Sequence, residues 1–217
     1  MHWPTVIERN RDDLLKIVAM LVLMTGRAVA GVLPRRVHRA VVNVLLPAEA
    51  ALRRLIAIAA AQVTVEPREA GPMPEGGIPE GAGKRKRAPS FPLFDRRRSV
   101  DPKGRTVPGF GPNIGGFDDD EPRPPEGRAA GPDDPVDAER LARRLAAAQA
   151  ALSDIPGQAR RLARILAARR SRWLRVMRPG RPPGHRARGR HPVDGVLADC
   201  HQLALMALHE KESRAPP

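Results

Sequence analysis

The helical pattern that decides the fold is LPRRVHRAVVNVLLPAEAALRRLIAIAAAQ, residues 33–62. Apolar residues recur at helical spacing in both of its halves: Val37, Val41, Val44 and Leu45, then Leu52, Leu55, Ile56 and Ala59. Arginines occupy other faces of both halves. Because proline fits the first turn of a helix and disrupts its interior, Pro34 and Pro47 predict two helices here. We expect them to run from Pro34 to about Leu46 and from Pro47 to about Gln62.

A further helix is predicted before this stretch, from about Thr5 to Leu33. Its part from Leu14 to Leu33 is mostly apolar and about as long as a bilayer is thick. Placed on a helical wheel, its polar positions share one narrow stripe: Arg9, Asp13, Lys16, Met20 and Arg27. We therefore favour a soluble or peripheral amphipathic helix. A membrane span, and a signal peptide with Ile17–Met24 as its apolar core, are the alternatives.

The middle of the chain, residues 66–134, has a different composition. It contains 13 Pro and 12 Gly, and its charges are segregated into basic runs and one acidic run. Such a composition disfavours a packed core, so the sequence predicts a disordered linker. The four Phe residues of the chain lie in this block.

Two of these aromatic residues, Phe91 and Phe94, belong to the segment SFPLFDRRR, residues 90–98. Apolar anchors followed by a basic tail are typical of a linear motif that docks on a protein partner. The alternative is that the segment packs back onto the chain's own helices. We leave both interpretations open at this point.

The region 135–210 predicts further helices. Two are expected within 135–177, the second capped by Ser153 or Asp154 with Pro156 in its first turn. A last helix is expected from about Val193 to Leu208, and residues 211–217 read as a disordered tail. No long alternating strand pattern is present.

These patterns together predict a mainly α protein, a small helical bundle interrupted by a long Pro/Gly-rich disordered linker. The segments are 1–65, 66–134, 135–210 and 211–217. The core is expected to be aliphatic, because the chain has no Tyr, four Phe and two Trp. Each helical block is small for a core of its own, so we expect the two blocks to pack together.

The chain is strongly basic, with a net charge of +14. Residues 155–193 hold twelve arginines and no Asp or Glu. Arginine pairs well with phosphate, which favours an anionic membrane surface or nucleic acid as partner. An Arg-rich genome is the alternative explanation. The anion-binding candidates are those in the helical part of the segment: Arg160, Arg161, Arg164, Arg169, Arg170, Arg172 and Arg175.

No catalytic site can be assembled from the sequence. Cys200 and His201 are neighbours on a predicted helix and so point about 100° apart, which favours a core cysteine. As the sole cysteine of the chain, Cys200 also excludes an internal disulfide. The spacing of the histidines matches no zinc motif. We therefore expect no cofactor, no metal site, no small-molecule substrate and no enzymatic activity.

Several segments resemble an uncharacterised family of hypothetical bacterial proteins: HWPTVIERNR (2–11), LPRRVHRA (33–40), LPAEAALRRLI (46–56), FPLFD (91–95), and RPGRPPGH (178–185) through Cys200-His201. The resemblance covers both helical blocks and the Phe motif. It implies a bacterial gene product and no particular reaction.

The sequence thus favours a non-enzymatic helical interaction protein that engages an anionic surface, such as membrane lipid, and a protein partner through Phe91 and Phe94. A nucleic-acid-binding protein is the first alternative. An inner-membrane protein anchored by the first helix is the second. We expect a cytoplasmic location, with peripheral attachment or anchoring at the inner membrane as variants.

Overall fold

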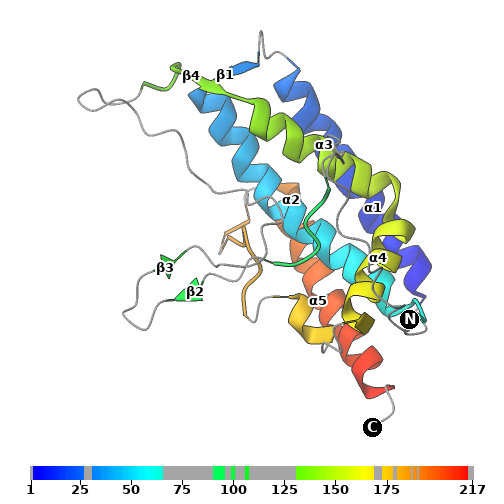
Figure 1. Ribbon diagram of the computed structural model, residues 1–217. Helices are drawn as coiled ribbons and strands as arrows, with labels where there is room; N and C mark the ends of the chain where they lie inside the picture. The colour runs from blue at the N-terminus through cyan, green and yellow to red at the C-terminus, as the bar shows by residue number, and fades with distance from the viewer. Residues whose placement is uncertain are drawn as a thin grey trace, which may run out of the picture.

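A computed structural model describes residues 2–26, 31–65, 90–95, 99–100, 106–107, 131–168, 173–177, 180–186, 188–189 and 191–214. The elements are mainly helical, which confirms the predicted fold class (Figure 1). The helices are α1 (Trp3–Thr25), α2 (Arg35–Ala61), α3 (Glu139–Ser153), α4 (Ile155–Ala168), the 3-10 helix η1 (Trp173–Val176) and α5 (Pro192–Ser213). Most of the predicted linker 66–134 and the tail 215–217 lie outside the described residues.

The centre of the bundle is α2, which contacts α1, α3, α4 and α5 (Figure 1). Its second half is buried on nearly every side, including Leu52, Leu55, Ile56 and Ile58, each at most 1% exposed. A helix that is apolar around its circumference is stable only when other helices cover it. Residues of the N-terminal and C-terminal blocks therefore share one aliphatic core, which confirms that the two blocks pack together.

The prediction of two helices between Pro34 and Gln62 is wrong, because α2 continues through Pro47. Proline has no N–H, so the carbonyl of Asn43, four residues earlier, loses its usual helical donor. The guanidinium of Arg186 replaces that donor and lies 2.6 Å from the Asn43 oxygen. The loop that carries Arg186 also lies directly on the proline, since a Cβ at Gly184 would be 2.7 Å from the Pro47 nitrogen. A distant loop thus compensates for the proline.

The first helix is shorter than predicted, ending at Thr25 with Gly26 as its C-cap rather than at Leu33. Gly31, at φ 77°, then redirects the chain into the short strand β1 (Val32–Pro34). This strand pairs antiparallel with β4 (Pro135–Asp137), Leu33 facing Val136. A second short pair joins β2 (Ser99–Val100) to β3 (Thr106–Val107). Strands of two or three residues are too short to give an alternating pattern.

The β1–β4 pairing also positions the start of α2. The backbone N–H of Arg35 donates to the carbonyl of Asp134 at 2.9 Å, and that of Arg36 to the carbonyl of Pro132 at 2.8 Å. Two of the N–H groups that a helix start leaves unpaired are satisfied in this way. The N-terminal block is therefore joined to the C-terminal block by backbone bonds as well as by side-chain packing.

The C-terminal helices begin where the sequence predicts. The Asp154 carboxylate accepts the backbone N–H of Gly157 at 2.9 Å, so the predicted cap between α3 and α4 is confirmed. Helix α5 starts at Pro192, after a capping box formed by His191 and Asp194. It continues to Ser213, about one turn past the predicted end, and the additional turn contains Lys211.

Helix α1 carries its charges on one exposed edge. Arg9 and Lys16 are exposed, and Lys16 donates to Asp13 at 3.3 Å, one of the pairings that the helical spacing allows. The opposite side, with Leu14, Val18 and Leu21, is buried in the core. Over the part of the chain that the structure describes, none of the helices combines the length and the apolarity needed to cross a membrane.

Candidate functional site

The Phe segment packs into the chain's own core. Phe91 and Leu93 are only 3% and 4% exposed, and Phe94 packs against the same core from a half-buried position. The segment is fixed by backbone contacts at both ends. Arg161 donates to the Phe91 carbonyl at 3.4 Å, and the Asp95 N–H donates to the Val176 carbonyl at 3.4 Å. Of the two interpretations of this segment, the structure supports packing onto its own helices.

Asp95, at the end of this segment, is held between two arginines of α2. Its carboxylate accepts from Arg54 at 2.8 Å and from Arg53 at 2.9 Å. The Arg54 side chain is fully buried and also donates to the Ala50 carbonyl at 2.7 Å. Burial lowers the pKa of Arg54, and the nearby Asp95 carboxylate opposes that shift. This buried ion pair attaches residues 90–95 to the central helix.

The third partner of Arg54 is His201 on α5, whose Nδ1 lies 3.1 Å from Arg54 Nε. Because Arg54 has only donors, His201 accepts this bond and is neutral. Burial lowers the pKa of His201, and the positive charge of Arg54 adds to this effect. His201 therefore serves as a hydrogen-bond acceptor in the core.

Its neighbour Cys200 is fully buried, and its thiol donates to the Asn10 side-chain oxygen at 3.5 Å. Burial raises the pKa of this thiol to about 12. A protonated, buried thiol is a poor nucleophile, which agrees with the interpretation of Cys200 as a core residue.

A second buried ion pair joins Glu49 of α2 to Arg144 of α3. Arg144 donates twice to the carboxylate, at 3.0 Å from Nε and 3.0 Å from a terminal nitrogen. Sequence reasoning missed both buried pairs. The available signal was the position of Glu49, Arg54 and Arg144 among the apolar residues of their helices, where an unpaired charge is unfavourable.

Helix α4 presents part of the predicted anion-binding segment. Arg160 and Arg164, one turn apart, are exposed, whereas Arg161 is half-buried and donates to the Phe91 carbonyl. The remaining candidates are not placed: Arg169, Arg170 and Arg172 lie outside the described residues, as does the side chain of Arg175. The structure thus brings two exposed candidates together and gives Arg161 a structural bond.

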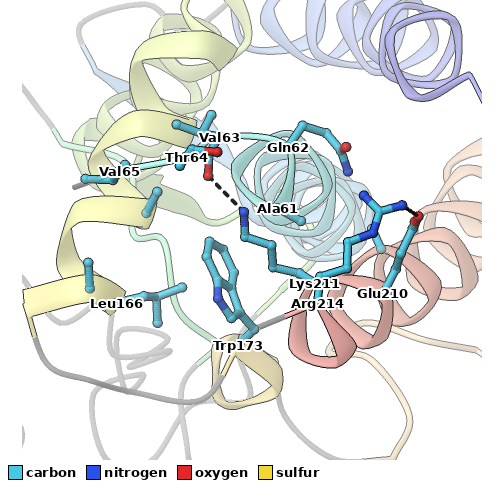
Figure 2. A pocket seen from close by; sticks show the side chains of 13 residues that line it. Ala61, Gln62, Val63, Thr64, Val65, Leu166, Trp173, Glu210, Lys211 and Arg214 are labelled. Atoms are coloured by element: carbon cyan, nitrogen blue, oxygen red, sulfur yellow. Dashed lines mark hydrogen bonds and ion pairs between the residues drawn. The ribbon is translucent and has the colours of Figure 1, made fainter. Parts of the chain in front are cut away.

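A cavity of about 590 Å³ lies where the C-terminal end of α2 meets α4, α5 and η1 (Figure 2). Its walls are largely apolar, and four alanines from three helices contribute to them: Ala61, Ala163, Ala167 and Ala207. Leu166 and Trp173 close one side. The sequence analysis did not anticipate this cavity, because its walls come from segments far apart in the chain.

The polar groups of the cavity come mainly from the last turn of α5. Lys211 extends across it and donates to the Val63 carbonyl at 3.2 Å, with its ammonium 5.6 Å from the centre of the Trp173 ring (Figure 2). Glu210 pairs with Arg214. The lining therefore contains two cations and one carboxylate, and the carboxylate is already paired.

Other chemistry finds no support in the geometry. Within the described ranges, no three His, Cys, Asp or Glu side chains gather as a metal site would require. Comparison with protein-family models, curated proteins and solved structures found no match to this chain. The function is therefore argued from the exposed arginines of α4 and from the cavity.

Proposed function

We propose that the protein is a non-enzymatic helical interaction protein that binds the surface of an anionic membrane through the outward face of α4. The observation that carries this proposal is the pair Arg160 and Arg164, both exposed on a helix that contains no acidic residue. The opposite side of α4, including Leu162 and Leu166, is anchored in the core. The arginines are thus presented by a rigid element.

The pairing of other surface arginines supports this choice of face. Exposed arginines elsewhere have carboxylate partners: Arg9 with Asp199, Arg36 with Asp133, Arg143 with Glu139, and Arg214 with Glu210. Arg160 donates to the Pro156 carbonyl at 3.3 Å, and no carboxylate of the described residues pairs with it or with Arg164. Both guanidinium groups keep donors for phosphate oxygens.

The rest of the exposed face of α4 consists of small residues. Pro156 and Ala168 are exposed beside the two arginines, and no large apolar side chain of α4 is exposed. Such a face binds electrostatically and does not insert into the bilayer. The proposal assigns no role to Phe91 in a contact with another protein, because that side chain is buried in the core.

The experiment compares the binding of the full chain to phosphatidylglycerol-containing vesicles and to phosphatidylcholine vesicles. Each Arg near an anionic surface contributes about 1 kcal/mol, so Arg160→Gln with Arg164→Gln should weaken binding about 30-fold. Arg36→Gln with Arg39→Gln is the matched control, because it removes the same charge from exposed positions at the other end of the bundle (Figure 1).

Equal loss in the two double variants would show that net charge, rather than this face, determines binding. Binding to duplex DNA or RNA but not to vesicles would replace the proposal with its nucleic-acid alternative. Binding that resists high salt would also contradict it, because electrostatic attachment is screened by salt.

A further inference from the structure

We propose that the cavity between the end of α2, α4 and α5 binds a single-chain amphiphile with an acidic head, of the fatty-acid class. This inference is independent of the proposed attachment to a surface, because the cavity needs no membrane to be occupied. It rests on the size of the cavity, on its apolar walls and on the charge at its mouth.

The walls suit an apolar chain. Small-molecule pockets generally measure about 300–1,000 Å³ and are lined mostly by hydrophobic side chains. This cavity measures about 590 Å³. Ala61, Ala163 and Ala207 are almost fully buried, yet their methyl groups also border the cavity. Short side chains on three facing helices leave space that larger residues would fill, and an alkyl chain can occupy that space.

The mouth suits a negative head group. The ammonium of Lys211 has three N–H donors, and the one hydrogen bond that the structure gives it ends on the Val63 carbonyl. Trp173 stabilises the same charge through its ring face. Since Glu210 is paired with Arg214, one positive charge remains in excess. A carboxylate near Lys211 would accept a charge-assisted hydrogen bond.

The end of α2 explains why the head group should be anionic rather than cationic. The last carbonyls of a helix carry partial negative charge, which by itself would attract a cation. Lys211 already fills that role through its bond to Val63, just beyond the end of α2. A ligand cation would meet Lys211 and Arg214, whereas a ligand carboxylate would meet their donors.

The test is calorimetric titration of the full chain with decanoate. Decyltrimethylammonium, which has the same chain and a positive head, and acetate, which has no chain, are the ligand controls. We expect saturable binding of one decanoate per protein and none of either control. Lys211→Met should weaken decanoate binding about tenfold, the equivalent of one charge-assisted bond. Lys16→Met, at an exposed position of α1, should leave it unchanged.

A second pair of variants tests the cavity itself. Ala167→Leu places a larger, helix-favouring side chain into the cavity and should abolish saturable binding. Ala168→Leu adds the same side chain one residue later, at an exposed position that does not line the cavity, and should bind normally. Thermal melts of all variants separate loss of binding from loss of fold.

Three outcomes would overturn the inference: no saturable decanoate binding, equal binding of decyltrimethylammonium, or equal behaviour of the two leucine variants. The double variant Arg160→Gln with Arg164→Gln keeps the two proposals apart, because it should lose vesicle binding and retain decanoate binding. If it loses decanoate binding as well, the fatty acid is held by the surface of α4 and the cavity assignment fails.

Discussion

Asp95→Asn should destabilise the fold by about 3–5 kcal/mol, the usual cost of leaving one partner of a buried ion pair without the other. The Asp95 and Arg54 side chains are 2% and 0% exposed, so water cannot replace the lost charge. The variant keeps the shape of the side chain but leaves Arg53 and Arg54 without a compensating anion. The midpoint of urea unfolding, followed by circular dichroism, measures the effect.

The matched control is Asp133→Asn, which breaks an ion pair of similar length on the surface. Arg36 and Asp133 lie 3.0 Å apart, with both side chains more than two-thirds exposed, so the cost should stay below about 1 kcal/mol. Arg54→Met combined with Asp95→Leu should recover much of the lost stability, because the double change removes both buried charges. If Asp95→Asn costs no more than Asp133→Asn, residues 90–95 are not held by this pair.

Three further perturbations test other parts of the fold. Phe91→Ala should lower stability by about 3–5 kcal/mol through the cavity it leaves, and a cost below 1 kcal/mol in denaturant unfolding would argue against its burial in the core. Gly184→Ala should reduce the melting temperature far more than Gly180→Ala; both glycines have positive φ, but only the first has Pro47 within 4 Å, so similar melting temperatures would contradict the close approach of this loop. Because the pKa of His201 is lowered in the folded state, the unfolded chain takes up a proton first as the pH falls, so stability is complete above about pH 6.5 and declines below it. The variant His201→Gln should show a weaker decline in acid unfolding curves, and an unchanged decline would exclude this histidine as its source.

The helices could be predicted from the sequence because their apolar residues recur at helical spacing, which is a local property. The break predicted at Pro47 was wrong for a reason that local sequence does not contain. The unpaired Asn43 carbonyl receives its donor from Arg186, 143 residues later. The strand at Val32–Pro34 was likewise invisible, because its partner lies beyond position 130 and neither strand exceeds three residues.

The candidate site was predictable only in part. The charge of α4 is evident in the sequence as a run of arginines without acids, and the structure shows which of them are exposed. The cavity was not predictable, since Val63, Trp173 and Lys211 are separated by more than 35 residues and meet only when three helices pack. The role of Arg161 also differed from expectation, because its bond to the Phe91 carbonyl depends on where the Phe segment lies.

The burial of α2 has a consequence for synthesis of the chain on the ribosome. Because α2 is covered partly by α5, which ends at Ser213, its apolar surface stays incomplete until 152 residues beyond Ala61 have been made. At about 5–20 residues per second, that interval lasts about 8–30 s. Throughout it, the nascent N-terminal half exposes an aliphatic helix whose buried Arg54 lacks first Asp95 and then His201. Nascent chains of this protein should therefore depend on chaperone protection, and fragments truncated before α5 should aggregate.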